Sequence, residues 1–144
     1  MVIDIRKIRA TGKNEQDFYF EYYPEIEISN IPSVSVAMPI KINGTCFLTD
    51  KHSVYIEGEV NYTLEGECCR CLTNVSRQYT VELKETAGED ENSYPVVNDT
   101  VDLTKIVEDS VLTDLPVSFL CSENCKGLCF NCGANLNTEK CKCK

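Results

Sequence analysis

The sequence predicts an α+β fold in which a mostly antiparallel β-sheet carries one amphipathic helix and a C-terminal zinc knuckle. Three observations support this prediction: long segments that alternate apolar and polar residues, one stretch with helical periodicity, and ten cysteines among 144 residues. Alternation with period two is typical of strands that bury one face, whereas apolar residues three and four positions apart indicate a helix. A chain of this length buries about two thirds of its unfolded surface, which is enough for one hydrophobic core.

The first predicted strands lie in the N-terminal third of the chain. After a basic start, Phe18–Tyr23 is an aromatic, strand-like run that ends at Pro24. Its acidic neighbours favour packing in the sheet over stacking on nucleic-acid bases. Residues 33–42 alternate with period two, and within this region Pro39 indicates an edge strand and Asn43-Gly44 a turn. The apolar face of this strand consists of Val34, Val36, Met38, Ile40 and Ile42.

A β-hairpin is predicted over residues 54–83. Residues 54–64 alternate apolar and polar side chains, residues 75–83 do the same, and the segment Cys68–Cys71 lies at the tip between them. The first strand of the hairpin presents Val54, Ile56, Val60, Tyr62 and Leu64 on one face. The stretch 85–94 is acidic and poor in apolar residues, which indicates a flexible, solvated loop.

The one predicted helix covers residues 102–115. Asp102 is suited to cap its N-terminus, and Pro116 ends it. Glu108 lies on the flank of the apolar stripe and Asp109 on the far side, so both are expected to face solvent. There they are candidate partner-binding residues, together with Arg70 of the hairpin tip. The stripe itself consists of Leu103, Ile106, Val107, Val111 and Leu115.

Eight of the ten cysteines occur in four pairs whose spacing suits metal ligation. We call Cys68/Cys71 the hairpin pair, Cys121/Cys125 the post-helix pair, Cys129/Cys132 the knuckle pair and Cys141/Cys143 the terminal pair. Short turns can direct two sulfurs at one ion, and four thiolates without an open position suit structural zinc. Disulfides are not expected, because they persist in oxidising compartments and the opening residues carry no export signal. The sequence therefore predicts two structural zinc sites, with an iron–sulfur cluster as the alternative.

Two groupings of the four pairs provide four sulfurs per ion. In the preferred grouping, the knuckle pair joins the terminal pair and the hairpin pair joins the post-helix pair, because the knuckle then keeps its nearest partner in sequence. In the rival grouping, the post-helix and knuckle pairs share one ion, and the hairpin and terminal pairs share the other. Cys46 is expected to be a small buried side chain. Cys69 could replace Cys68 as a ligand, although the C-x2-C spacing favours Cys68.

The charge distribution divides the chain into a predicted acidic domain, residues 1–120, and a predicted cysteine-rich zinc-binding tail, residues 121–144, packed on it. The domain holds ten Lys/Arg against 21 Asp/Glu, whereas the tail holds four lysines against two acids. An acidic body opposes non-specific RNA binding, because that affinity comes from cations that displace counterions. No apolar run approaches the roughly 20 residues that cross a bilayer, so we expect no membrane association. A nuclease is not expected, because the sequence holds no phosphate-binding glycine loop and a single histidine.

Four segments and the tail together form a specific combination of motifs. The segments are Cys68-Cys69-Arg70-Cys71-Leu72, Asp102-Leu103, Val107-Glu108-Asp109 and Leu115-Pro116. Together with the tail cysteines they resemble the YceD family, whose members are called large ribosomal RNA subunit accumulation proteins, and the tail looks like the ending of its Gram-positive-type members. The resemblance covers about residues 60–144, and Cys69 is a departure from it. It implies a bacterial cytoplasmic protein that supports synthesis, processing or stability of 23S ribosomal RNA, without known enzymatic activity.

The leading functional hypothesis is a non-enzymatic factor whose acidic surface binds a ribosomal protein or a precursor of the large subunit, with no small-molecule substrate. The second is a direct contact with ribosomal RNA through Arg70, Arg77 and the tail lysines, Lys140, Lys142 and Lys144. The third is a thiol-based redox enzyme or metal sensor. Its candidate nucleophile is Cys69, since the neighbouring cation Arg70 could lower the pKa of that thiol, and His52 is the only imidazole.

Overall fold

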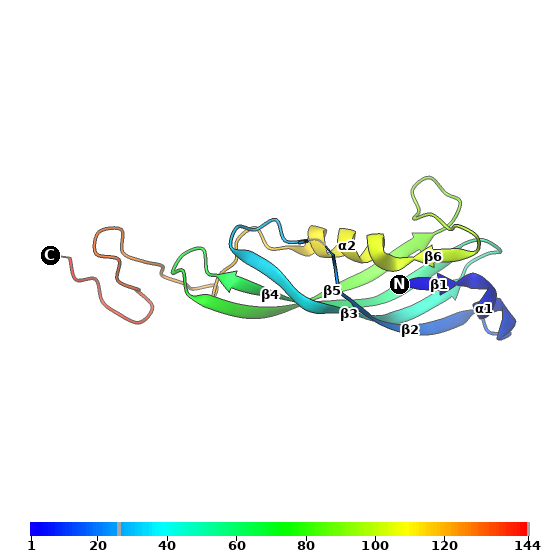
Figure 1. Cartoon of the computed structure of the whole chain (residues 1–144), viewed down its shortest axis with the longest axis horizontal. Helices are drawn as coiled ribbons and strands as arrows, with labels where there is room; N and C mark the ends of the chain where they lie inside the picture. Colours follow the sequence, from blue (N-terminus) through cyan, green and yellow to red (C-terminus); the bar gives the residue numbers. More distant parts are fainter. Residues whose placement is uncertain (26, 144) are drawn as a thin grey trace.

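A computed structural model describes residues 1–25 and 27–143 of the chain. Figure 1 shows an elongated molecule built mainly from long antiparallel strands, with α2 packed along them and the C-terminal tail extending beyond one end. The predicted fold class is confirmed, although a short second helix accompanies the predicted one. The elements are β1 (Val2–Asp4), α1 (Ile5–Ala10), β2 (Glu15–Tyr22), β3 (Val34–Leu48), β4 (Val54–Glu67), β5 (Asn74–Ala87), β6 (Thr100–Asp102) and α2 (Leu103–Asp114).

The main sheet has four antiparallel strands in the order β2-β3-β4-β5, and β1 pairs with β6 in a separate two-stranded sheet. The predicted hairpin is confirmed: β4 and β5 pair without a register shift from Val54↔Ala87 to Glu67↔Asn74. Its inward-facing residues in β4 are the predicted ones, and all are buried. The hairpin tip between Glu67 and Asn74 therefore stands at one end of the sheet, next to the segment that follows α2.

The predictions of a turn at Asn43-Gly44 and of an edge strand at Pro39 are wrong. The apolar alternation continues through buried Cys46, and β3 runs straight through Gly44, which pairs with Gly58 of β4. The chain turns later, where the amide of Thr49 donates to the carbonyl of Ser53 (3.1 Å). β3 is an internal strand that tolerates Pro39 because the register with β4 shifts between residues 37 and 41.

The register shift also explains one error in the predicted apolar face of β3. Met38 lies within the shifted segment and is 56% exposed, while the other four predicted residues of that face are buried. A bulged strand bends, so side chains on either side of the bulge no longer share one direction. The bend separates the part of β3 near the hairpin tip from the part that pairs with β2.

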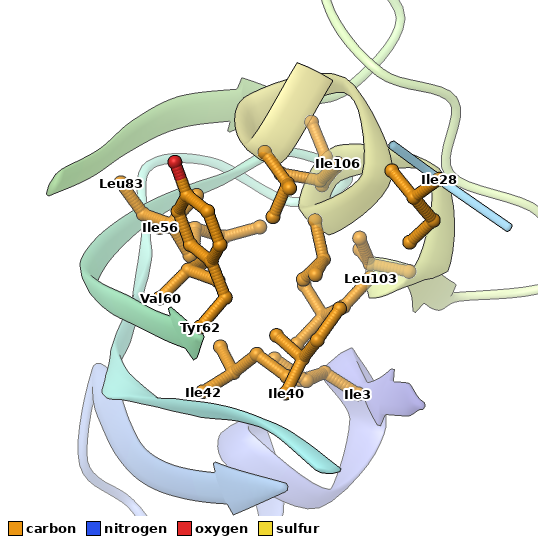
Figure 2. Packing of buried hydrophobic residues seen from close by; sticks show 14 of the residues in the cluster. Ile3, Ile28, Ile40, Ile42, Ile56, Val60, Tyr62, Leu83, Leu103 and Ile106 are labelled. Atoms are coloured by element: carbon orange, nitrogen blue, oxygen red, sulfur yellow. The ribbon is translucent and has the colours of Figure 1, made fainter. Parts of the chain in front are cut away.

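The hydrophobic core fills the inner face of the sheet, on the side where α2 and the β1–α1 segment lie (Figure 2). The stripe of α2 is confirmed, and Asp102 caps the helix by accepting a hydrogen bond from the amide of Thr104 (2.9 Å). The unpredicted helix α1 begins after Asp4, whose carboxylate accepts from the amide of Arg6 (2.9 Å), and it buries Ile5 and Ile8. Neither helix of the described residues has the length and apolarity needed to cross a membrane.

Two predictions about polar and aromatic segments have different outcomes. The aromatic run forms β2, where Phe18, Phe20 and Tyr22 pack against the core as expected. The acidic stretch 85–94 is only partly a loop, because β5 extends to buried Ala87. Tyr94 then pairs with that end of β5, and this pairing closes the loop between them.

Candidate metal centres

The structure brings the eight predicted cysteines together in two groups, and each group follows the preferred pairing rather than the rival one. The hairpin and post-helix pairs form the proximal cluster, Cys68, Cys71, Cys121 and Cys125. The knuckle and terminal pairs form the distal cluster, Cys129, Cys132, Cys141 and Cys143. Within each cluster all four sulfurs lie within 4.8 Å of one another. Sequence segments about fifty residues apart thus meet in the proximal cluster, whereas the distal cluster is local.

The hairpin tip supplies two sulfurs of the proximal cluster from a tight turn. The amide of Cys68 donates to the carbonyl of Thr73 (2.9 Å), and the amide of Leu72 donates to the carbonyl of Cys68 (2.9 Å). Leu72 takes a left-handed conformation, with φ 62°, which lets the chain return into β5. The hydroxyl of Thr73 lies 3.3 Å from the sulfur of Cys71. This turn fixes both sulfurs on the side that faces the post-helix segment.

The post-helix segment supplies the other two sulfurs, and the main core anchors it. Phe119 is fully buried in the core, and its carbonyl accepts a hydrogen bond from the amide of Cys69 (2.8 Å). The guanidinium of Arg70 donates to the carbonyl of Cys125 (3.0 Å), and that of Arg77 donates to the carbonyl of Leu120 (3.2 Å). Both arginines therefore position the backbone beside the cluster, a role that the sequence did not reveal.

The distal cluster is a compact loop outside the sheet. The sulfur of Cys129 lies 3.4 Å from that of Cys141 and 3.7 Å from that of Cys143. The amide of Gly133 donates to the carbonyl of Cys129 (3.0 Å), and Gly133 has φ +74°, so the chain leaves the knuckle in the conformation that glycine favours. Unlike the proximal cluster, whose sulfurs are mostly buried, this cluster is largely exposed to solvent.

The distances between sulfurs fit tetrahedral zinc better than disulfides. Zinc–sulfur bonds of about 2.3 Å in a tetrahedron place two sulfurs about 3.8 Å apart. The Cys68–Cys125 and Cys71–Cys121 separations are both 3.6 Å, and that of Cys132 and Cys141 is 4.0 Å. A disulfide requires about 2.05 Å. Both clusters therefore have the donor atoms and the spacing for one ion each.

Backbone amides favour the thiolate form of cysteines in both clusters. Burial raises the pKa of Cys68, but amides of the surrounding turns outweigh it and lower that pKa to about 6. The amides of Cys132 and Asn131 likewise lower the pKa of Cys129 to about 6. A hydrogen bond with the sulfur of Cys125 raises the pKa of Cys121 to about 12. Neighbouring thiolates repel one another, so the four thiols of a cluster do not all ionise without a cation. A dication placed between the sulfurs would offset this repulsion and allow all four thiols to ionise.

Asn137 links the two clusters and was not identified from the sequence. Its side-chain oxygen accepts from the amide of Lys126 (2.9 Å), and its side-chain nitrogen donates to the sulfur of Cys125 (3.4 Å). A residue of the distal loop thus completes the surroundings of a proximal sulfur. The only signal in the sequence is a pair of asparagines between the knuckle and terminal pairs, Asn135 and Asn137.

The two acidic residues predicted to face solvent on the helix are hydrogen-bonded to the sheet and its neighbouring loop. Glu108 accepts from the hydroxyl of Tyr22 (2.5 Å), and Asp109 accepts from that of Tyr94 (3.0 Å). Burial and these bonds raise the pKa values of Tyr22 and Tyr94 to about 12. Asp114 makes the same kind of bond with the hydroxyl of Tyr62 (2.7 Å). Three carboxylates of α2 therefore hold the helix in register on the sheet.

The residues proposed for a thiol-based enzyme, Cys69 and His52, do not lie near each other. Cys69 is exposed at the hairpin tip, while the guanidinium of its neighbour Arg70 bonds a backbone carbonyl. His52 precedes β4 and Cys69 follows it, so the two residues lie at opposite ends of a strand of 14 residues. As expected, Cys46 is fully buried, and burial raises the pKa of its thiol to about 11.

The outer face of the main sheet, which we call the open face, is strongly acidic. It carries the side chains of β2–β5 that alternate away from the core, opposite the face on which α2 packs (Figure 2). Its cations are Lys41 and Lys84. Its acids are Glu15, Asp17, Glu21, Glu57, Glu59, Glu65, Glu67 and Glu82. The open face thus concentrates much of the negative charge of the domain on a rigid surface.

Comparison with known proteins gives a consistent family. The model of the family described as "Large ribosomal RNA subunit accumulation protein YceD" matches residues 56–144. An uncharacterized protein of Mycobacterium tuberculosis is 37% identical over 97 residues, covering 60% of this chain and 46% of the relative. The chain thus spans about half the length of the mycobacterial relatives it matches. No solved structure matches it.

Two further relatives differ in how much of the chain they cover. The "Large ribosomal RNA subunit accumulation protein YCED homolog 1, chloroplastic" of Zea mays is 39% identical over 57 residues, which is 39% of this chain and 20% of the relative. The Bacillus subtilis protein YlbN is 25% identical over 124 residues, which is 75% of this chain and 69% of the relative. The family match contains both cysteine clusters and most of the hairpin that presents the proximal one. On this match, the chain belongs to the YceD family of large ribosomal RNA subunit accumulation proteins.

Proposed function

We propose that this protein is a non-enzymatic ribosome-biogenesis factor of the bacterial cytoplasm that supports synthesis, processing or stability of 23S ribosomal RNA. It acts by binding a basic ribosomal protein, or an assembly intermediate of the large subunit, through an acidic scaffold stabilised by two zinc ions. The family name supports the link to large ribosomal RNA. The observation that carries the mode of binding is the acidic open face.

The proximal cluster supports a structural rather than a catalytic metal. Four thiol ligands fill a tetrahedral shell, whereas catalytic zinc keeps one position for water or substrate. Cys68, Cys71 and Cys125 are buried, so the ion would be shielded from solvent. A structural zinc of this kind contributes on the order of 10–16 kcal/mol of apparent binding free energy, which exceeds the usual net stability of a domain. The ions would therefore hold the hairpin tip, the post-helix segment and the tail in place.

Charge favours a basic partner over a nucleic acid. Each zinc ion bound by four thiolates carries a net charge of about −2, so metal binding leaves the clusters anionic. The open face adds eight carboxylates against two lysines. Such a surface repels phosphates and attracts the lysines and arginines of a basic protein, which also accelerates their encounter.

The test compares two pairs of charge-neutralising substitutions in cells that lack the wild-type gene. Glu57→Gln with Glu59→Gln neutralises the centre of the open face, and Glu89→Gln with Glu91→Gln neutralises two exposed acids of the loop after β5. We expect the loop variant to restore the level of 23S relative to 16S ribosomal RNA and the open-face variant to fail. Equal restoration by both variants, at equal protein levels, would contradict the proposal.

One observation favours direct RNA binding as a second candidate function. The ring of Phe130 is fully exposed between the knuckle cysteines, where Lys142 of the tail is also exposed. Aromatic rings and lysines on a zinc knuckle can stack on and neutralise single-stranded RNA. Arg70 and Arg77 are engaged with backbone carbonyls, and Lys144 lies outside the described residues. RNA affinity should then fall steeply with salt and on Phe130→Ala, and a flat salt response would exclude this candidate.

A further inference from the structure

We infer that the outer edge of β5 binds an extended, lysine- or arginine-rich peptide segment as an additional β-strand. The inference rests on the proposed function, because it adds to the open face a second binding surface for the same basic partner, at the sheet edge beside α2. It combines three features: a free strand edge, backbone groups directed outward along it, and an acidic groove between this edge and α2. The segment recognised would be a flexible, basic arm of the partner.

β5 is free over about eight residues of its outer edge. It is the last strand of the sheet and pairs with β4 alone. At one end, the amide of Tyr94 donates to the carbonyl of Thr86 (3.0 Å). At the other end, the guanidinium of Arg77 bonds the post-helix segment. Between residues 78 and 85 no backbone group of the described residues bonds the outer edge of β5, which leaves about 26 Å of edge for a ligand.

The direction of the free backbone groups follows from the contact with Tyr94. The carbonyl of Thr86 and the amide of Gly88 both bond Tyr94, so both point away from β4. Successive residues of a strand direct their backbone groups to opposite sides, and β5 pairs with β4 without a register shift. The amides and carbonyls of Gln78, Thr80, Glu82 and Lys84 therefore point outward. These groups form one half of a hydrogen-bond ladder.

A groove beside this edge carries the charge that selects a basic ligand. Glu85 and Val81 line it from β5, Asp109 and Asp114 from α2, and Tyr94 from the loop between them. The side-chain amine of Lys105 bonds one oxygen of Asp109 (3.2 Å). A strand added about 4.8 Å from β5 would direct alternate side chains into this groove. Lysine or arginine at every second position would thus meet three carboxylates, and phosphates would be repelled.

The test uses two substitutions at one position. Because the amide of Gln78 points outward, Gln78→Pro removes a free donor without removing a bond to β4, as edge strands tolerate. Gln78→Ala keeps the amide and removes the same side chain, which makes no hydrogen bond to the rest of the described chain. The probe is a fluorescein-labelled peptide of eight residues that alternates lysine and threonine. Its affinity for the zinc-loaded full chain is measured by fluorescence anisotropy.

We expect the wild-type protein and Gln78→Ala to bind the peptide equally and Gln78→Pro to bind it at least tenfold more weakly. Glu85→Gln should also weaken binding and reduce its dependence on salt. A peptide with N-methylated amides at alternate residues keeps the charges but cannot complete the ladder, and it should lose tenfold or more on the wild-type protein. This second measurement remains decisive if Gln78→Pro does not fold, which circular dichroism and zinc content would show.

Three results would overturn the inference: no binding of the alternating peptide, equal binding of the N-methylated peptide, or displacement of the peptide from this edge by oligouridylate. The failure of the inference can be told apart from that of the proposed function. Suppose that the peptide does not bind at β5, while the variant with Glu57→Gln and Glu59→Gln still fails to restore the level of 23S ribosomal RNA. The acidic open face would then act without the addition of a strand. If the open-face variant restores it fully, the proposed function fails as well.

Discussion

At the scale of single residues, Cys68 and Cys69 are neighbours at the hairpin tip with different surroundings. The sulfur of Cys68 is buried in the proximal cluster, while Cys69 is exposed outside it. We therefore predict that Cys68→Ser removes one zinc ion per chain and lowers the free energy of unfolding by about 4 kcal/mol or more. Cys69→Ser should keep two ions and change stability by less than about 0.5 kcal/mol. Zinc content by elemental analysis and urea unfolding measure both effects, and the reverse pattern would assign the ligand to Cys69.

The tyrosine–carboxylate pairs predict a loss of stability at high pH. Burial and the bond to Asp109 raise the pKa of Tyr94 to about 12, above an unfolded value of about 10. A raised pKa means that the unfolded state loses its proton first, so this stabilisation is complete below pH 10 and is lost between pH 10 and 12. The slope is up to about 1.4 kcal/mol per pH unit.

Tyr94→Phe tests this pH dependence, because phenylalanine has no proton to lose. We expect its free energy of unfolding to fall less steeply than that of the wild-type protein between pH 9 and 11. Tyr23→Phe is the control, since Tyr23 is exposed and its hydroxyl bonds, among the described residues, only Glu21 two residues away. Identical slopes for wild type and Tyr94→Phe would show that Asp109 does not stabilise the protonated tyrosine.

At the scale of elements, the sequence patterns correctly predicted those helices and strands that depend on residues close together in the sequence. The helix, its cap at Asp102 and the β4–β5 hairpin follow from periodicity and were confirmed. The Asn43-Gly44 turn was wrong because pairing of a long β3 with β4 outweighs a local turn preference. Helix α1 was missed because six residues give too little periodicity. The grouping of cysteines was predictable for the same reason as the hairpin: short turns bring paired sulfurs together.

The contact between the two clusters was not predicted by any local sequence pattern. Asn137 lies in the distal loop and bonds the sulfur of Cys125 in the proximal cluster. Groups that hydrogen-bond a metal ligand commonly change metal affinity by 10–100-fold. We predict that Asn137→Ala accelerates release of the proximal zinc to a chelator by about tenfold. Asn131→Ala is the control, because the contribution of Asn131 to Cys129 comes from its backbone amide. Equal release rates would show that the clusters act independently.

At the scale of the whole molecule, the hydrophobic core and the metal clusters stabilise different parts of the chain. The sheet, α2 and the β1–α1 segment bury one continuous core. Beyond the hairpin tip the chain has a second, smaller buried group made of the proximal cysteines with Leu120 and Leu128. The acidic open face could not be located from composition alone, because the strand register decides which carboxylates share a face. The composition of the domain shows its net negative charge, whereas the strand topology shows on which face the carboxylates lie.

Because the two clusters differ in burial and in what they connect, we predict that a chelator removes the two zinc ions in a fixed order. The distal cysteines are mostly exposed and are held together by a short loop, whereas the proximal cysteines are mostly buried and join the hairpin to the segment after α2. During titration with a chelator, the first ion should therefore leave with little change in far-ultraviolet circular dichroism. Release of the second should coincide with a fall in Tm of about 10 °C or more, because the post-helix segment loses its attachment.

Variants lacking one site identify which ion is which. Cys141→Ser with Cys143→Ser should abolish the fast phase of zinc release and leave the Tm of the sheet within a few degrees of wild type, about 1 kcal/mol in stability. Cys121→Ser should abolish the slow phase and lower the Tm even before any chelator is added. If both variants lost the same phase, or if removing the distal ion unfolded the sheet, the tail would be an integral part of the core. The proximal cluster would then not be the attachment that holds the hairpin to the rest of the chain.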